Sequence, residues 1–379
     1  MDKRARRIPN FKRIGHKTKK AAAFSIKVLA FFAGFFLGIW GVFSMAKNGS
    51  DFFYYAMAFA APGSAIEFLN QPVSAPKEDL STDLIIEESD VLILEEPKEE
   101  TAFTEEPSVE IPENRRGKIT EMQYSAKEGG SYIAYKNAII KNCTTHSTNK
   151  IKSMLKESHE LSLSSEIGAL PQILIYHTHA TEGFEAQDSG VFDTEGTWRS
   201  TDNSKNMVAV GDVLESVLNR GGIGVIHDRT QHDDPSYNGS YQRSAVTISG
   251  YLNENPTIEI CLDLHRDAIE PSEKEIIKPT AVINGKKAAQ IMIIAGCDDG
   301  SMNMPEYWEN LRFAAALADK LEELYPGITR PILFDYRKYN MDLSPGLVLI
   351  EIGATGNTLD EAKYSAELLG NALIALFFE

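Results

Sequence analysis

The stretch Ile173-Leu174-Ile175-Tyr176-His177-Thr178-His179-Ala180-Thr181-Glu182 joins a short apolar strand directly to two histidines and a glutamate. His179 and Glu182 are three residues apart, a spacing that lets an imidazole and a carboxylate bind one metal ion just beyond a strand end. In open α/β sheets, ligands bind beyond the carboxyl ends of the strands. The stretch therefore predicts both a buried strand and a site at its end.

Two later apolar strands end in the same way, in Ile258-Glu259-Ile260-Cys261-Leu262-Asp263-Leu264-His265-Arg266-Asp267 and in Leu347-Val348-Leu349-Ile350-Glu351-Ile352-Gly353. From Gly168 onward, apolar strands alternate with amphipathic helices. Continuous Val, Ile and Leu strands between helices are typical of buried, parallel sheets. We predict an α/β fold with a mostly parallel sheet and helices on both faces. Its strands are expected at 172–177, 223–227, 258–264, 279–283, 290–295, 331–334 and 346–352, and its helices at about 204–220, 238–253, 306–324 and 359–377.

Local signals mark two helix ends. Asn219-Arg220-Gly221-Gly222 stops the helix near 204, since glycine commonly follows a helix. Thr358 and Glu361 have the spacing of a capping box at the start of the last helix.

Charge is unevenly distributed along the 379 residues, whose net charge is −16. Residues 1–20 carry nine Lys or Arg, and the nineteen residues Val28–Ala46 carry no charge. An apolar run of about 20 residues is long enough to span a membrane, and the basic cluster before it predicts a cytoplasmic N-terminus. A cleaved signal peptide is the alternative, with small residues at Ala58-Phe59-Ala60. A retained single-pass anchor fits the length of the run better.

The composition suggests five regions. These are a basic cytoplasmic tail (1–27), a transmembrane anchor (28–46), an aromatic and then acidic extracytoplasmic linker (47–116), a small N-terminal region (117–165) and a hydrolase domain (166–379). Fourteen Asp or Glu between Lys77 and Asn114 predict an extended tether. The three cysteines lack the spacing of a disulfide framework.

The strand-end residues match a catalytic zinc site. His179, Glu182 and His265 supply two nitrogens and one carboxylate, which leaves a position open for water. Glu351 is the expected general base, because hydrolysis needs a proton acceptor for the water and a proton for the departing amine. The sequence thus predicts a zinc hydrolase.

Several neighbouring residues have more than one possible role. Asp263 and Asp267 are candidates to orient a ligating histidine. Arg266 either holds a substrate oxygen or forms a salt bridge with one of these aspartates. His177 is a ligand, a proton shuttle or a packing residue, and Asp202 is the alternative to Glu182. The loop with His227 and His232 is a further candidate to line a substrate groove.

Three blocks resemble one known family. Ile175–Glu182 (IYHTHATE), Asp263–Asp267 (DLHRD) and Ile350–Thr358 (IEIGATGNT) are similar to the stage II sporulation protein P family of endospore-forming bacteria. The resemblance covers about residues 165–379.

This resemblance implies a membrane-anchored, zinc-dependent peptidoglycan hydrolase that cleaves the N-acetylmuramoyl-L-alanine amide and also acts as an endopeptidase on cross-links. It implies work in forespore engulfment with the sporulation proteins D and M of the same stage, between the mother-cell and forespore membranes. By motif, His179 and His265 would be zinc ligands and Glu351 the catalytic carboxylate. The wider amidase class takes its Glu ligand from a downstream helix start, which keeps Asp202 open beside Glu182.

Two other functions compete. One is a catalytically silent wall-binding or activator module, which would need none of His179, His265 and Glu351. The other is a zinc carboxypeptidase for soluble peptides, whose ligand pattern is similar. The anchor and tether favour a stationary, polymeric substrate. The basic run at 1–20 could also bind nucleic acid, but its place beside the apolar run favours a role in membrane topology, so no nucleic-acid partner is expected.

Overall fold

The computed structural model describes residues 111–164 and 170–378, which belong to one compact unit. The expected cytoplasmic tail, the anchor at 28–46 and the linker up to residue 110 lie outside the described residues. Within the described part of the chain, no helix has the length and apolar character needed to cross a membrane.

An eight-stranded sheet forms the centre of the fold, in the order β2-β3-β11-β10-β12-β7-β4-β6. Five of its seven pairings are parallel, and β2–β3 and β10–β12 are antiparallel. The expected α/β class is confirmed, with a mixed sheet. The chain reaches β10 from β7 through a hairpin, whereas a parallel crossover usually contains a helix. The strands are β2 (Tyr132–Tyr135), β3 (Ala138–Asn142), β4 (Pro171–Tyr176), β6 (Gly224–His227), β7 (Ile260–Asp267), β10 (Ile291–Gly296), β11 (Ile332–Asp335) and β12 (Leu347–Ala354).

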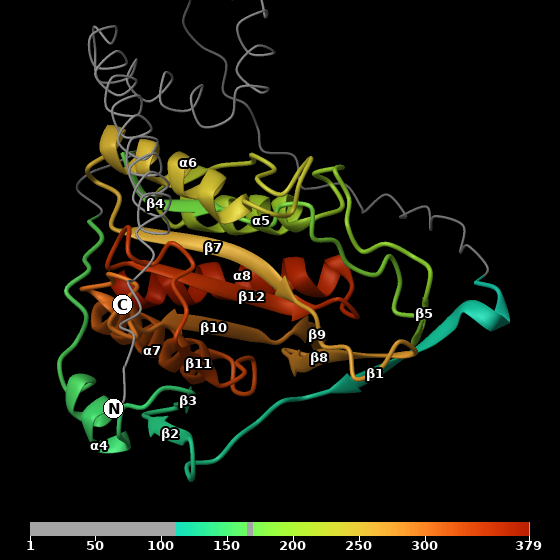
Figure 1. Cartoon of the computed structure of the whole chain (residues 1–379), viewed down its shortest axis with the longest axis horizontal. Helices are drawn as coiled ribbons and strands as arrows, with labels where there is room; N and C mark the ends of the chain where they lie inside the picture. Colours follow the sequence, from blue (N-terminus) through green and yellow to red (C-terminus); the bar gives the residue numbers. More distant parts are fainter. Residues whose placement is uncertain (1–110, 165–169, 379) are drawn as a thin grey trace, which may run out of the picture. The chain divides into compact units, whose positions relative to one another are not determined.

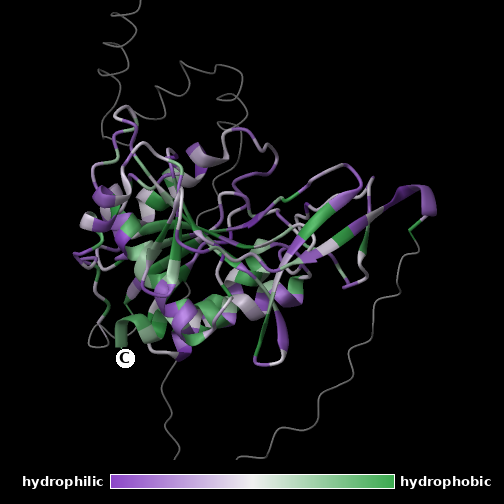
Figure 2. Ribbon diagram, turned by 90° about the horizontal axis from the view of Figure 1, so that it is seen from below, coloured by the Kyte–Doolittle hydropathy of each residue, from purple (hydrophilic) through white to green (hydrophobic). Residues whose placement is uncertain are grey.

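Helices cover both faces of this sheet, as expected (Figure 1). One face packs against α5 (Met207–Arg220), α7 (Tyr307–Leu324) and α8 (Leu359–Phe378), and the other against α6 (Ser240–Glu254). A short helix, α4 (Thr148–Met154), lies beside β2. Hydrophobic residues gather along the central strands, while the helices alternate between hydrophobic and hydrophilic residues (Figure 2).

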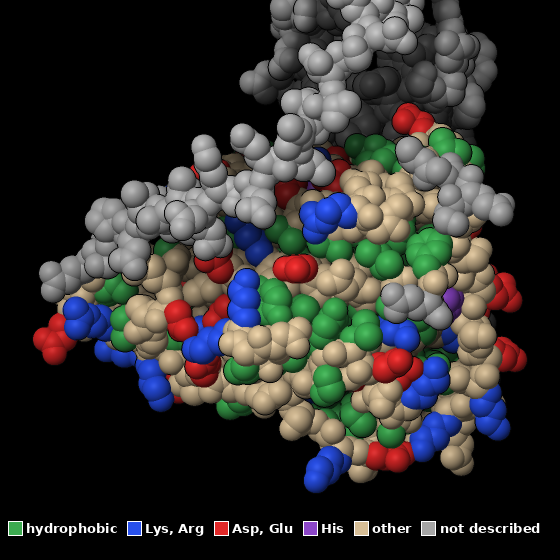
Figure 3. Space-filling view, turned by 180° about the vertical axis from the view of Figure 1, so that it is seen from behind, with side chains coloured by type: hydrophobic (Ala, Val, Ile, Leu, Met, Phe, Trp, Pro, Cys, Tyr) green, Lys and Arg blue, Asp and Glu red, His purple; other side chains and the backbone are tan. Residues whose placement is uncertain are grey.

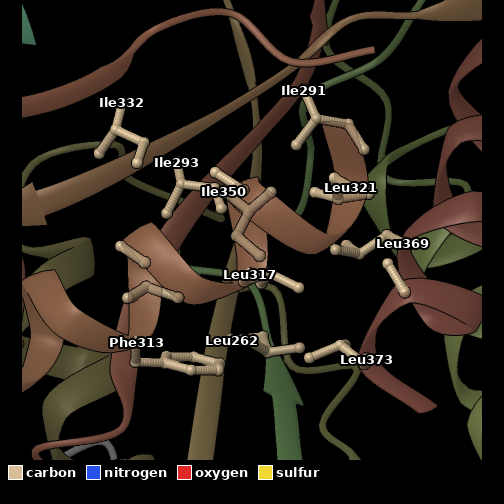
Figure 4. Close-up of a cluster of buried hydrophobic side chains, with 14 of the residues drawn as sticks. Leu262, Ile291, Ile293, Phe313, Leu317, Leu321, Ile332, Ile350, Leu369 and Leu373 are labelled. Atoms are coloured by element: carbon tan, nitrogen blue, oxygen red, sulfur yellow. The ribbon is translucent and has the colours of Figure 1, made fainter. Parts of the chain in front are cut away.

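Strand alternation divides the core into two layers. In β4, Ile173 and Ile175 belong to the cluster beneath α5, α7 and α8, whereas Leu174 and Tyr176 belong to the cluster beneath α6. The larger cluster includes Leu262 of β7, which Figure 4 shows among the side chains of Phe313, Leu317 and Leu373. Full burial of one such side chain contributes about 1.5–3 kcal/mol.

A second, four-stranded sheet has the order β5-β1-β8-β9. It consists of β1 (Arg116–Met122), which follows a 3-10 turn at Glu113–Arg115, β5 (Val191–Asp193), β8 (Glu275–Ile283) and β9 (Lys286–Ala289). β1 pairs with both β5 and β8, while β2 and β3 join the main sheet. The segment 111–142 therefore contributes strands to both sheets.

Ion pairs connect the second sheet to α8. Lys278 of β8, whose side chain is 1% exposed, lies 2.6 Å from Glu361 and 2.8 Å from Asp188. Lys287 pairs with Asp188 and with Glu121. Figure 3 shows basic and acidic side chains side by side toward this end of the molecule.

Both helix-end predictions are confirmed. Glu361 Oε2 accepts from the Thr358 backbone N–H at 3.1 Å, and Thr358 Oγ1 accepts from the Glu361 N–H at 3.3 Å. Helix α5 ends at Arg220, and Gly222 follows with φ of +82°. This left-handed conformation favours glycine.

Candidate active site

A cavity of about 320 Å³ lies on the α6 side of the sheet, at the ends of β4, β7 and β12. It collects side chains from the three ionisable strand ends and from the loops that follow them. Its lining residues are His179, Glu182, Arg199, Tyr237, Tyr241, His265, Arg266, Asp267, Ala268, Tyr339, Leu349 and Glu351. His179, Glu182, His265 and Glu351, which the sequence singled out, therefore meet in one place.

His179 enters the cavity from a turn beyond β4. Its ring stacks on Tyr237 with centroids 4.2 Å apart and lies at 90° to the His265 ring, 5.2 Å away. Its Nδ1 is buried and has no hydrogen-bond partner. Burial, followed by the charge of His265, lowers the pKa of His179 to about 4. The ring is thus neutral, as a metal ligand must be, and no hydrogen bond occupies its Nδ1.

Glu182 faces both histidines from the same turn. Its Oε2 accepts a hydrogen bond from the Arg266 backbone N–H at 3.1 Å and lies 3.6 Å from His265 Nδ1. Burial alone would raise the pKa of Glu182, but His265 and Arg266 lower it to about 2. The carboxylate is therefore ionised.

His265 lies between two carboxylates. Its Nε2 is 2.9 Å from Asp263 Oδ1, and its Nδ1 faces Glu182. Burial alone would lower the pKa of His265, but Asp263 and Glu182 raise it well above its ordinary value. The two carboxylates favour the protonated ring, so a metal ion bound at Nδ1 would have to displace a proton. The Asp263 carboxylate lies beside Nε2, where a carboxylate commonly orients a ligating histidine.

Asp263 also holds the turn that carries His179. Its Oδ1 accepts from the Thr178 backbone N–H at 2.8 Å, and its Oδ2 accepts from the Thr178 hydroxyl at 2.7 Å. One buried carboxylate thus positions both histidine-bearing segments. The predicted orienting role fits Asp263, whereas the Asp267 carboxylate pairs with Arg330 at 2.8 Å.

Glu351 completes the set from β12. It is paired with His265 in the register of β12 and β7, and its Oε2 is buried without a hydrogen-bond partner. Burial raises the pKa of Glu351 to about 8. A carboxyl group that is held free of partners beside the donor atoms has the placement of a general acid and base.

Arg266 lines the cavity, and its guanidinium donates hydrogen bonds mainly to backbone carbonyls around it. Its Nε donates to the Gly183 carbonyl at 2.7 Å, and its terminal nitrogens donate to the carbonyls of Trp198 and Asp267 and to Thr355 Oγ1. These contacts include no carboxylate, so the expected salt bridge to Asp263 or Asp267 is absent, while the expected contact with a substrate oxygen stays a prediction. Arg266 therefore positions the loop at 183–198.

The structure does not bring His177 into the cavity. Its Nδ1 lies 3.1 Å from the Leu264 carbonyl and its Nε2 lies 2.8 Å from His227 Nε2. Both rings contact the position of Gly211 in α5, on the opposite face from α6. The expectation that His177 shares a face with His179 is wrong because β4 ends at Tyr176, and strand alternation stops there.

Three other candidates also lie outside the cavity. Asp202 is exposed, and its Oδ1 accepts from the backbone N–H and hydroxyl of Ser204. His227 contacts His177, and His232 Nδ1 lies 2.8 Å from the His177 carbonyl. Of the two alternative carboxylate ligands, the structure places Glu182 beside the histidines.

Three tyrosines and one arginine that line the cavity were not predicted from the sequence. Tyr237 lies in the loop before α6 and Tyr241 in its first turn, and the Tyr241 ring stacks on Tyr339 with centroids 5.0 Å apart. Arg199 lies over the Tyr237 ring, 4.9 Å from its centroid. The four-residue spacing of the tyrosines was the available signal, but it is equally common in helix cores.

Solved structures with a similar chain path are distant. N-acetylmuramyl-L-alanine amidase Ami1 of Mycobacterium smegmatis is 12% identical with a TM-score of 0.33, over 55% of this chain and 98% of that one. Amidase AmiC2 of Nostoc punctiforme is 11% identical with a TM-score of 0.33, over 54% and 94%. Similarity this low says nothing about the function of this chain.

Sequence comparison gives a firmer result. Stage II sporulation protein P of Bacillus subtilis (strain 168) is 26% identical over 218 residues, which are 55% of this chain and 51% of that protein. The match spans about half the length of that relative. The family model of stage II sporulation protein P matches residues 83–374, well over half of the chain. The chain belongs to the stage II sporulation protein P family.

Proposed function

We propose that this protein is a zinc-dependent peptidoglycan hydrolase that cleaves the amide between N-acetylmuramic acid and the L-alanine of the stem peptide. The observation that carries this proposal is the meeting of His179, Glu182, His265 and Glu351 in one cavity of about 320 Å³. Family membership supports the substrate class.

The donor types of the cavity, two imidazoles and one carboxylate, suit a zinc ion. His179 Nδ1 is buried without a hydrogen-bond partner, His265 Nδ1 lies 3.6 Å from Glu182 Oε2, and His265 Nε2 lies 2.9 Å from Asp263 Oδ1. Two nitrogens and one carboxylate oxygen are a common ligand set of catalytic zinc. When bound, zinc polarises a carbonyl group and lowers the pKa of bound water.

The remaining chemistry belongs to the protein's own side chains. Glu351 accepts the proton of the attacking water and returns it to the amine of L-alanine as the amide bond breaks. Asp263 keeps the His265 ring in its orientation, and Arg266 keeps the loop at 183–198 in place. Tyr237, which is 55% exposed, offers an aromatic surface at the cavity mouth for the substrate.

A membrane anchor and a tether at the N-terminus would suit an enzyme that acts on a stationary polymer. We extend the proposal to a single-pass anchor at 28–46 with its N-terminus in the cytoplasm, an acidic tether and an extracytoplasmic catalytic unit. By family resemblance, the setting is engulfment during sporulation, with the proteins D and M of the same stage as partners. Peptide cross-links are a second substrate for the same groups.

The test uses the full chain in detergent with purified peptidoglycan, with and without a chelator, and mass spectrometry of the products. We expect stem peptides with a free L-alanine amino group, whose release stops with the chelator and resumes with added zinc. Cleavage that is insensitive to the chelator would overturn the metal mechanism. A protein that binds wall material without releasing any product would support the silent-module alternative.

A further inference from the structure

A second group of donor atoms lies on the α5 side of the main sheet, away from the cavity. Asp212 and Glu215 of α5 are three residues apart and face His227 at the end of β6. His227 Nδ1 lies 3.1 Å from Asp212 Oδ1 and 3.6 Å from Glu215 Oε2. One donor atom from each residue lies within 4.8 Å of the others, a spacing compatible with a shared metal ion.

A chain of hydrogen bonds identifies the free nitrogen of His227. The Leu264 carbonyl can only accept, so His177 Nδ1, 3.1 Å away, carries a hydrogen. Because a neutral imidazole carries one N–H, His177 Nε2 then accepts from His227 Nε2 at 2.8 Å. This places the hydrogen of His227 on Nε2 and leaves Nδ1 as a bare lone pair. Full burial of both rings disfavours an extra proton on either.

The bare lone pair points at two carboxylates. The His227 side chain is fully buried, and its Nδ1 has no hydrogen-bond partner among the described residues. A lone pair and two carboxylates repel one another unless a cation lies between them. Among the described residues, neither a hydrogen-bond donor nor a cation binds this lone pair.

Arg229 places a positive charge beside the two carboxylates but does not bind His227 Nδ1. Its guanidinium donates to Asp212 Oδ1 at 2.9 Å, to Glu215 Oε2 and to the His227 carbonyl. These bonds satisfy the carboxylates but leave the imidazole lone pair unpartnered. Because the Arg229 side chain is 46% exposed, it can move aside for a smaller cation.

We propose that Asp212, Glu215 and His227 form a second metal site, which takes a divalent first-row transition metal such as Zn²⁺ or Mn²⁺. One imidazole nitrogen and two carboxylate oxygens suit such ions. The Asp212 side chain is 47% exposed and that of Glu215 is 24% exposed, so water reaches the remaining coordination positions. The ion would connect β6 to α5 and stabilise the native state, because it binds only when both are in place.

Metal content per chain tests this site. The full-length protein is stripped with a chelator, reloaded with Zn²⁺, freed of excess ion and measured by mass spectrometry of the metal. We expect two equivalents in the wild type and one in the Asp212→Asn/Glu215→Gln double variant. His265→Ala should also hold one equivalent, and the combined variant none. Asp188→Asn is the matched control, since lysines already neutralise that carboxylate, and it should keep both.

The outcomes separate this site from the catalytic proposal. If the cavity binds no zinc, the wild type would hold one equivalent and the double variant none, which supports the second site alone. One equivalent in the wild type that vanishes in His265→Ala overturns the second site. So does a double variant that keeps the wild-type content, or a wild type that holds no metal.

The Arg229→Gln variant is a second test, because it should strengthen Zn²⁺ binding where the double variant abolishes it. Removal of the competing guanidinium should tighten Zn²⁺ binding at the second site several-fold. Unchanged or weaker binding contradicts the proposal. This variant changes an exposed side chain, and circular dichroism checks that each variant remains folded.

Discussion

Glu351 of β12 lies opposite His265 of β7 in the register of two parallel, neighbouring strands. Their side chains point to the same face of the sheet because paired residues share a face. The backbone pairing therefore sets the distance between the proposed proton carrier and a proposed zinc ligand.

Glu351→Gln should abolish most amide cleavage while zinc remains bound. The amide has the shape of the carboxylate but cannot accept the proton of water, a loss of about 10²–10⁴-fold in rate. Product release and metal content are measured on the same sample. Asp202→Asn, an exposed change away from the cavity, should keep both. Activity within a few-fold of wild type in Glu351→Gln would exclude Glu351 as the general base.

Asp263→Asn should weaken zinc binding. The change removes a carboxylate that lies beside His265 Nε2 and accepts two hydrogen bonds from Thr178. Loss of such an orienting group typically lowers metal affinity about 10–100-fold. Competition with a chromogenic chelator measures the affinity. Asp193→Asn, whose carboxylate pairs with Arg115 outside the cavity, is the control. Equal affinities would show that Asp263 has no orienting role.

Arg266→Lys should lower stability as well as activity. An ammonium group cannot replace the bonds to the Gly183 and Trp198 carbonyls and Thr355, and each bond to a charged group is worth about 1.5–3 kcal/mol. Thermal unfolding should therefore begin at a lower temperature. A raised KM with unchanged stability would instead support the substrate-binding role first expected for Arg266.

The burial of His159 predicts that the folded protein loses stability in acid. Its ring packs between Phe313 and Phe377, and burial lowers its pKa from the ordinary 6.5. The unfolded chain therefore binds a proton more readily, so the stability contribution is complete above pH 6.5 and is lost as the pH falls toward the folded pKa. His159→Phe should reduce the fall in melting temperature between about pH 7.5 and 5.5. An equal fall in both proteins would contradict this account.

The sequence predicted the elements of the hydrolase region well because their signals are local. Buried apolar strands and the Thr358–Glu361 cap each lie within a few residues of sequence. The reversed direction of β10 depends on how the β8–β9 hairpin returns to the sheet, which no local pattern encodes. β1 and β5 were missed because they are short or polar and gain their partners far along the chain, as in the pairing of Lys118 with Val191 and the contact of Thr120 with Glu275.

The site was predictable where ionisable residues interrupt an apolar strand. His265 and Glu351 belong to strands, so alternation placed them correctly. His177 and His179 lie beyond the end of β4, where the turn decides which face each side chain reaches. Arg199 and Tyr237 come from loops, and only the folded chain brings them to the cavity.

The double role of the segment 111–142 limits where the protein can be shortened. A fragment that begins after Met122 would remove the strand that pairs with β5 in the described part of the chain and would turn β8 into an open sheet edge. Such edges recruit other chains and lead to aggregation. Loss of solubility in a fragment of this kind would reflect a missing strand, whatever the state of the zinc ligands. Truncations intended for crystallisation or secretion should therefore begin before Arg116.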